Sequence, residues 1–138
     1  MKLRSARVDD LDAVCTLDPL TRGDAARRKR VQAAFEEGFG WVAEAEGALL
    51  GFALAGPWFF GHPFLELLVV RESSRRRGVG RALVRAVEAR FAGAKLFTST
   101  NQSNAPMQRL LASLGHTPSG VIHNLDPGDP ELVFVRLG

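Results

Sequence analysis

The chain has 138 residues, a length that predicts one domain able to bury about two-thirds of the surface of its unfolded form. Its 46% hydrophobic and 24% charged residues are ordinary for a globular protein, and no apolar run reaches the ~20 residues that a membrane-spanning helix needs. The net charge of +3 comes from basic residues interspersed with acidic ones, which indicates a solvated surface and argues against nucleic-acid binding.

The numbers and spacing of cysteine and histidine argue against a disulfide and against a bound structural metal. The single cysteine, Cys15, excludes an intrachain disulfide and a multi-cysteine metal site, and we expect it in the core. The histidines lack the paired spacing of zinc ligands, so no metal is expected. The opening sequence MKLRSARVDD is not a signal peptide. These features predict a cytoplasmic protein.

The first half of the chain predicts a strand, two helices and a hairpin. Residues 2–8 alternate as a strand does, and Asp9 and Asp10 are placed to cap a helix. A second helix is expected over residues 24–37, its RRKR segment being solvated charge. Residues 41–56 read as two strands that turn at Glu46 and Gly47.

The second half predicts a buried strand followed by alternating helices and strands. An aromatic connection, PWFFGHPF at residues 57–64, leads into LELLVV at residues 65–70, which is apolar on both faces as in the centre of a sheet. We then expect a helix from Gly78, a strand over residues 94–100, a helix from Asn104 to Gly115, and strands over residues 116–122 and 131–137. The order βααβββαβαββ predicts an α/β fold with a mixed sheet of about six or seven strands and about four helices.

The helix near Gly78 begins with an unusual charge pattern. Three arginines, Arg75, Arg76 and Arg77, lie at the N-terminus of the helix, where the macrodipole disfavours each exposed cation by ~0.3–1 kcal/mol. Gly78 and Gly80 each cost about another 1 kcal/mol relative to alanine within a helix. A bound polyphosphate would explain both features, since arginines and free N–H groups bind anions and glycines allow close approach. The alternative is a basic surface turn with solvated charges.

Two common nucleotide motifs do not fit this segment. The phosphate-binding loop GxxxxGK[ST] requires a lysine that does not follow Gly80. The dinucleotide fingerprint requires a third glycine, and that position is Leu83.

Residues 75–80, RRRGVG, resemble the acetyl-CoA signature [Q/R]xxGx[G/A] of the GNAT superfamily of N-acetyltransferases. Residues 65–84 are similar to the fourth strand, loop and third helix of that family, and residues 104–116 to its fourth helix. The order of elements also resembles the family over nearly the whole chain. The resemblance implies a single GNAT-like acetyltransferase domain over residues 1–138, with acetyl-CoA as co-substrate.

The resemblance also implies which residues hold the cofactor. Residues of the fourth strand would bind the pantetheine arm, with Leu68 and Val70 pairing through their backbone on either side of Val69. Asn104 would contact the cofactor, although its role as a simple helix cap remains open and the two roles are compatible. The arginines from Arg75 would face anionic oxygens, and the CoA pyrophosphate would be cradled by backbone amides of Arg76, Arg77, Gly78, Val79, Gly80 and Arg81.

Glu66 is the best candidate for a general base. An aliphatic ammonium with a pKa near 10 needs to lose a proton before it attacks, and Glu66 is the only charged residue in LELLVV. Burial would raise the pKa of this carboxyl, and an acid at the matching position in the family often acts through water. The alternative is a carboxylate that pairs with an arginine or faces solvent. Backbone N–H groups at a strand irregularity near Leu68 to Val70 would bind the thioester oxygen.

No general acid can be assigned from the sequence. Many family members use a tyrosine on the fourth helix, but this chain has no tyrosine and the matching position is Leu111. His116 lies where the family usually has an aromatic residue, so we expect it to pack. No stronger case as the general acid can be made for the remaining candidates, which are Cys15, Ser113 and His123. Water is then the proton source for the thiolate.

The function implied is transfer of an acetyl group from acetyl-CoA to a primary amine of a small molecule or peptide by direct attack on the thioester. A non-catalytic acyl-CoA-binding or regulatory domain on the same fold is the alternative, and a nucleic-acid module ranks third. The aromatic residues in 57–64 would form an acceptor pocket, part of the core, or an oligomer interface such as that of a homodimer. The basic second helix argues against a polycationic acceptor.

Overall fold

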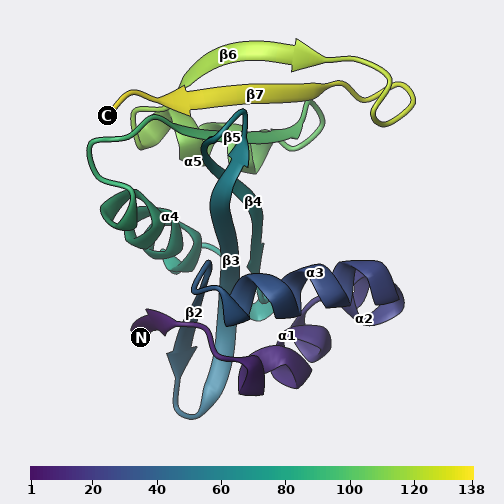
Figure 1. The fold of residues 1–138 in the computed structure, drawn as a ribbon, viewed down its shortest axis with the longest axis vertical. Coiled ribbons are helices and arrows are strands. Elements are labelled where there is room, and N and C mark those ends of the chain that lie inside the picture. The colour runs from purple at the N-terminus through teal and green to yellow at the C-terminus, as the bar shows by residue number, and fades with distance from the viewer.

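The computed structural model describes all 138 residues and contains one seven-stranded sheet with five α-helices (Figure 1). The strands follow the order β1-β2-β3-β4-β5-β7-β6, and only the β4–β5 pair is parallel. The mixed α/β sheet expected from the sequence is confirmed. Its elements are β1 (Lys2–Ser5), the 3-10 helix η1 (Val8–Asp10), α1 (Leu11–Leu17), α2 (Pro19–Gly23), α3 (Ala25–Glu36), β2 (Gly40–Ala45), β3 (Ala48–Phe59), β4 (His62–Val70), the 3-10 helix η2 (Glu72–Ser74), α4 (Val79–Arg90), β5 (Leu96–Asn101), α5 (Ala105–Ser113), β6 (Thr117–Ile122) and β7 (Glu131–Arg136).

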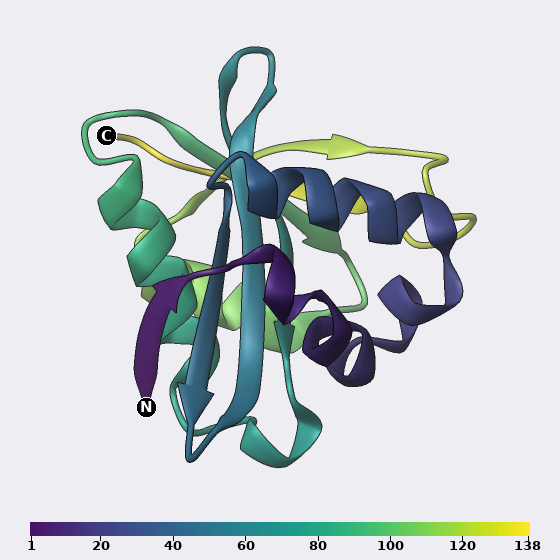
Figure 2. The same ribbon diagram turned by 60° about the horizontal axis from the view of Figure 1, so that its bottom comes forward.

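Helices cover both faces of the sheet, and each face has its own hydrophobic core. Helices α1 and α3 pack on one face, where the core includes Val14, Val31 and Phe52. Helix α4 packs on the other face, where the core includes Leu83 and Val87. The sheet is therefore covered on both faces along β2 and β3, which lie between the helices in Figure 2. None of the helices combines the length and the hydrophobicity that a membrane-spanning segment requires.

Aspartate side chains cap α2 and α3, and one cap expected from the sequence is wrong. Asp24 caps α3, its Oδ1 accepting from the N–H groups of Ala26 and Arg27. The cap expected from Asp9 and Asp10 is wrong, because the Asp10 carboxylate accepts instead from the Arg4 guanidinium and the Arg7 N–H. The short helix α2 was not expected; it begins at a proline, with the preceding Asp18 carboxylate as its cap.

The aromatic segment 57–64 is a hairpin rather than the expected connection. Strand β3 runs to Phe59, and β4 begins at His62 after a turn in which Phe60 and Gly61 have φ values of 53° and 81°. Two consecutive positive φ values match the right-handed twist of a hairpin. The tip of this hairpin projects beyond the helices at the top of Figure 2. Its aromatic residues have different surroundings: Phe59 stacks on Phe64, Phe60 is 91% exposed, and Trp58 lines a pocket described below.

Strand β4 separates from β5 immediately after a bulge at Glu66. Leu54 of β3 pairs with Leu67 and Ala55 pairs with Leu65, so Glu66 has no opposite residue. The β4–β5 ladder contains only two pairs, of which Leu65 with Thr98 is the last. The irregularity expected near Leu68 to Val70 thus lies at Glu66. LELLVV holds the expected central position, but residues beyond Leu65 are half-buried because β5 turns away.

Candidate active site

The loop that leads into α4 presents an unbroken run of free backbone donors. The N–H groups from Arg76 to Arg81 have no acceptor within the protein. The first N–H groups of a helix always lack helical partners, and here the preceding loop extends the run because Arg76 and Gly78 have positive φ values of 66° and 79°. Successive N–H groups in such a conformation form a concave anion-binding nest at the positive end of the helix dipole.

The arginines of this loop have no acidic partner in the protein. The side chains of Arg75, Arg76 and Arg77 are exposed and make neither an ion pair nor a hydrogen bond. Arg81 in the first turn of α4 donates to the Ser113 hydroxyl of α5 at 3.0 Å. The unfavourable charge at this helix end is therefore left uncompensated by the fold, as expected of a site built for an anion.

Gly80 lies where α4, α5 and the separated part of β4 meet. A Cβ at Gly80 would lie 3.5–3.8 Å from side-chain atoms of Leu110, Val70 and Leu68. The side chains of Leu68 and Val70 pack with the α4 core, whereas Val69 packs with the core on the opposite face. The structure thus brings the expected glycine and two of the expected strand residues together beside the open edge of β4.

Asn104 caps helix α5, which is one of the two roles expected for it; the other is contact with the cofactor. Its Oδ1 accepts from the N–H of Met107 at 3.2 Å. Its Nδ2 makes no hydrogen bond within the protein, which leaves one amide donor for a ligand. Capping and ligand binding therefore use different atoms of this side chain.

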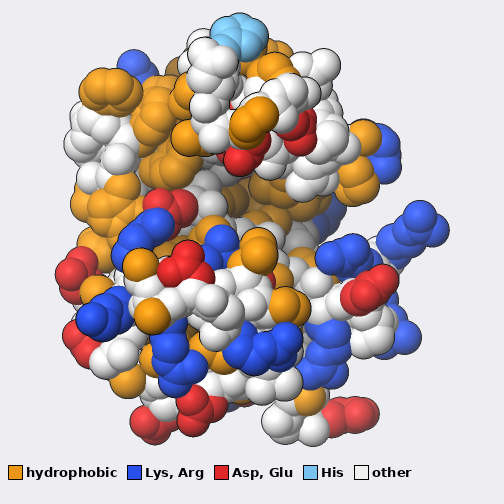
Figure 3. Space-filling view, turned by 90° about the vertical axis from the view of Figure 1, so that its right-hand side faces the viewer, with side chains coloured by type: hydrophobic (Ala, Val, Ile, Leu, Met, Phe, Trp, Pro, Cys, Tyr) orange, Lys and Arg blue, Asp and Glu red, His pale blue; other side chains and the backbone are white.

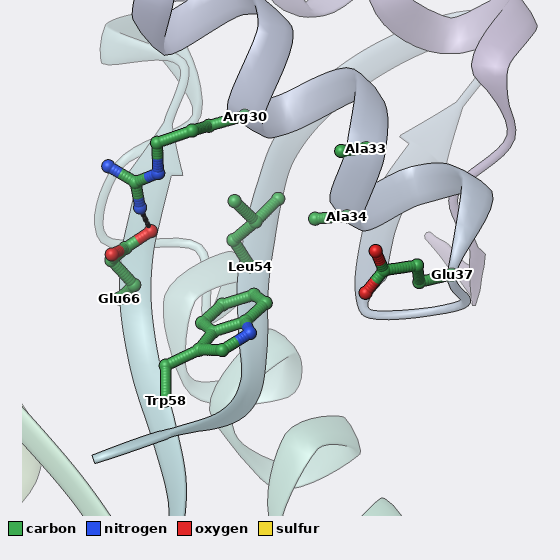
Figure 4. A pocket seen from close by; sticks show the side chains of 7 residues that line it. All are labelled: Arg30, Ala33, Ala34, Glu37, Leu54, Trp58 and Glu66. Atoms are coloured by element: carbon green, nitrogen blue, oxygen red, sulfur yellow. Dashed lines mark ion pairs between the residues drawn. The ribbon is translucent and has the colours of Figure 1, made fainter.

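A pocket of about 350 Å³ lies between α3 and the strands β3 and β4 (Figure 4). Glu66 reaches it from the bulge and forms an ion pair with Arg30 of α3. The Glu66 side chain is 24% exposed and that of Arg30 is 60% exposed. The arginine pairing considered for this carboxylate is therefore present, in a pocket that remains open to solvent.

Sequence reasoning missed two charged residues of this pocket, Arg30 and Glu37. Arg30 belongs to the RRKR segment that was interpreted as solvated charge, and its contact with Glu66 joins distant parts of the chain. Glu37 follows α3 and makes no hydrogen bond or ion pair through its side chain. The sequence did contain a signal for Glu37, because an acidic residue at the negative end of a helix dipole is unfavourable and so indicates a role other than helix stability.

The basic face of α3 is largely neutralised by acids from the preceding helices. Arg27 lies 2.8 Å from Asp18, and Arg28 lies 3.0 Å from Asp12. Burial of Asp18 acts to raise the pKa of its carboxyl, but hydrogen bonds from Thr21 and Arg27 outweigh burial and hold that pKa below its usual value. The repulsion of polycationic acceptors expected from this helix is accordingly weakened. Figure 3 shows blue and red side chains intermixed over the lower part of one face.

None of the residues considered as proton donors joins Glu66 in the pocket. His116 is buried with its Nε2 2.8 Å from Oε2 of Glu88, and Leu111 is fully buried. The remaining candidates lie elsewhere: Cys15 is buried beside Arg28, Ser113 is bound by Arg81, and His123 is exposed after β6. No group of three or more histidine, cysteine or acidic side chains is arranged to hold a metal ion.

The free donors at α4 and the separated β4 edge lie in the segments that resemble the GNAT family in sequence, and comparison with protein families gives the same assignment. Residues 7–116 match the family described as acetyltransferase (GNAT) family. The chain belongs to the GNAT acetyltransferase family.

Solved structures extend this GNAT assignment over nearly the full chain. An acetyltransferase of the GNAT family from Bacillus cereus ATCC 10987 is 32% identical, with a TM-score of 0.90 and coverage of 99% of this chain and 96% of the other. The ribosomal-protein-S18-alanine N-acetyltransferase of Escherichia coli is 22% identical, with a TM-score of 0.81 and coverage of 97% and 91%. The yncA protein of Salmonella typhimurium, solved with its cofactor acetyl-CoA, is 20% identical, with a TM-score of 0.78 and coverage of 99% and 92%. A search of curated proteins found no match.

Proposed function

We propose that this GNAT domain transfers the acetyl group of acetyl-CoA to the nitrogen of a primary amine on a small molecule or peptide. The observation that carries the proposal is the run of free N–H groups from Arg76 to Arg81, beside a strand edge that β5 leaves open. The yncA relative with acetyl-CoA supports the choice of donor. Acetyl-CoA supplies an activated acetyl group in the form of a thioester.

The residues present fit such a donor. The N–H groups of Arg76 to Arg81 suit the pyrophosphate, with the exposed guanidinium groups beside them. The open backbone edge of Leu68 to Val70 suits the amide groups of pantetheine, and Asn104 offers its Nδ2 as a further donor. Gly80 leaves space between this edge and α5.

Glu66 is the proposed general base. Its bulge lies where β4 leaves β5, so the carboxylate belongs both to the acceptor pocket and to the beginning of the open strand edge. Glu66 pairs with the Arg30 guanidinium as a carboxylate, and a carboxylate can accept a proton from the acceptor ammonium, directly or through water. No side chain is proposed as the acid, and water protonates the departing thiolate.

A pair of variants tests this role. We expect Glu66→Gln to lower kcat by about 100-fold or more in a thiol-release assay, while the Kd for acetyl-CoA measured by calorimetry stays within about twofold. Arg30→Gln removes the ion pair but keeps the carboxylate, so we expect kcat within a few-fold of the native value. Equal losses of kcat in both variants would mean that activity requires the Glu66–Arg30 ion pair and would give no support to Glu66 as the base. Absence of calorimetric heat with millimolar acetyl-CoA would overturn the whole proposal.

The alternative is a domain that binds acyl-CoA without catalysis, and the absence of tyrosine together with the burial of His116 favours it. Tight binding of acetyl-CoA with no thiol release across a panel of amines would select this alternative.

A further inference from the structure

Helix α3 ends with acidic charge that the fold does not balance. Glu36 is its last residue and Glu37 its C-cap, and no basic residue lies in the last turn. Negative charge is unfavourable at this end of a helix because the macrodipole is negative there. Glu36 accepts a hydrogen bond from the Gln32 amide at 3.2 Å, whereas the Glu37 carboxylate has no partner. The uncompensated acid is therefore the one that lines the pocket.

The pocket has an apolar middle with a carboxylate at each side. In Figure 4, Leu54 and Trp58 lie between Glu66 and Glu37. Leu54 is 1% exposed, so the pocket reaches the apolar core, and Trp58 adds a large ring that is 39% exposed. A ligand that fits this lining has an apolar central part and polar groups at its ends.

The unpaired charge of the pocket favours a cation at the Glu37 end. Arg30 is neutralised by Glu66, which leaves Glu37 as the unpaired charge and gives the three residues together a net negative charge. The neighbouring arginines Arg27 and Arg28 form ion pairs with Asp18 and Asp12, so they contribute little repulsion to a cationic ligand in the pocket.

We propose that Glu37 sets the specificity of the acceptor site by binding a second cationic nitrogen of the acceptor. This inference rests on the proposed function. The acceptor is then a small diamine: its reactive amine lies at Glu66, its apolar spacer lies on Leu54 and Trp58, and its second ammonium group forms an ion pair with Glu37. The two ammonium groups use the two carboxylates that the pocket presents.

The test compares α,ω-diaminoalkanes with monoamines of the same chain length in the thiol-release assay. For the native protein we expect kcat/KM to be about tenfold higher for the best diamine than for its monoamine, the effect of one charge-assisted contact. Glu37→Gln should bring this ratio close to one, mainly by raising KM for the diamine. Glu36→Gln is the matched control, because it removes the same charge from the same helix end outside the pocket, and it should keep the native ratio.

Each outcome separates this inference from the proposed function. Turnover of monoamines and diamines with equal kcat/KM overturns the specificity role of Glu37 and leaves the acetyl transfer intact. An equal loss of the ratio in Glu36→Gln and Glu37→Gln overturns it too, since a general charge effect would then explain the preference. Absence of turnover with both series overturns the proposed function and, with it, the diamine. Calorimetric binding of acetyl-CoA to each variant confirms that the compared proteins are folded.

Discussion

A Cβ atom placed on Gly80 would lie 3.6 Å from Cγ2 of Val70, at an ordinary van der Waals distance. The same atom would lie 3.5 Å from Leu110, and the backbone of Gly80 does not adopt a positive φ. The packing and the backbone conformation of the free protein would therefore accept alanine here. Since glycine is the less stable choice in a helix, we infer that its reason lies in the ligand that enters between β4 and α5.

Gly80→Ala should separate folding from binding. We expect the free energy of unfolding to stay equal or rise by up to ~1 kcal/mol, because alanine restricts the unfolded chain. The affinity for acetyl-CoA should fall by about tenfold, because the added methyl group occupies the space left for the ligand. Urea denaturation and calorimetry on the same preparation measure both quantities. Unchanged affinity would remove Gly80 from the binding site.

Gly78→Ala provides the contrast. Gly78 has a φ of 79° and open space around the position of its Cβ, so the cost of alanine there is conformational. We expect this variant to unfold more easily by ~1 kcal/mol. A stability loss in Gly80→Ala as large as that in Gly78→Ala would show that the fold itself requires both glycines.

The N-terminal part of α4 was predictable because its signals lie within a few consecutive residues. The arginines, Gly78 and the helical pattern after it are neighbours in the chain, so the dipole argument needed no tertiary contact. The bulge at Glu66 was not predictable in this way. It depends on the register in which Leu67 pairs with Leu54, and pairing register is decided by the whole hairpin.

Other differences arose where a distant contact outweighed a local rule. Asp10 has the residue type and position of a helix cap, but the guanidinium of Arg4 on β1 offers its carboxylate two charge-assisted hydrogen bonds. The turn at Phe60 and Gly61 lacks the usual asparagine or aspartate, and a phenylalanine with positive φ is rare enough to hide a hairpin. The partner of Glu66 on α3 required the fold itself.

Neutralising the loop arginines should raise stability while weakening binding. Arg75→Gln and Arg77→Gln each remove a cation from the unfavourable helix end, so we expect the free energy of unfolding to rise by ~0.3–1 kcal/mol. Each substitution should weaken acetyl-CoA binding by about two- to fivefold. This effect should be smaller at high salt, because salt screens exposed charges. Arg90→Gln, at the opposite end of α4, is the control and should leave binding unchanged. Binding that does not change with either arginine would favour the solvated-turn alternative.

His116 should prove structural. Its Nε2 contacts the buried Glu88 carboxylate, which also lies 2.9 Å from Arg85. His116→Leu removes a hydrogen-bond partner from a buried acid, so we expect a loss of about 2 kcal/mol in the free energy of unfolding, with kcat unchanged below the unfolding temperature. His123→Leu alters an exposed residue and should shift stability by less than about 0.5 kcal/mol. A loss of kcat without a loss of stability would instead identify His116 as a proton donor.

The Arg4–Asp10 pair should make stability depend on pH in the acid range. Hydrogen bonds from the Arg4 guanidinium hold the pKa of the Asp10 carboxyl below its ordinary value of 3.8, against the opposing effect of burial, and the Arg7 N–H adds to the lowering. A carboxyl with a lower pKa in the folded state stabilises the fold above the unfolded pKa, and this stabilisation is lost as the pH falls through the folded pKa.

Asp10→Asn tests this dependence. At pH 7 we expect the free energy of unfolding to fall by about 1–3 kcal/mol, because the asparagine loses the charge-assisted hydrogen bonds to Arg4. Below pH 4 the native protein loses the same contribution, so urea denaturation curves of the two proteins should converge as the pH falls. Asp9→Asn, an exposed neighbour without a partner, should follow the native pH dependence. A difference between native protein and Asp10→Asn that stays constant from pH 7 to the acid range would mean that the Asp10 charge contributes nothing, and that only its shape and neutral hydrogen bonds matter.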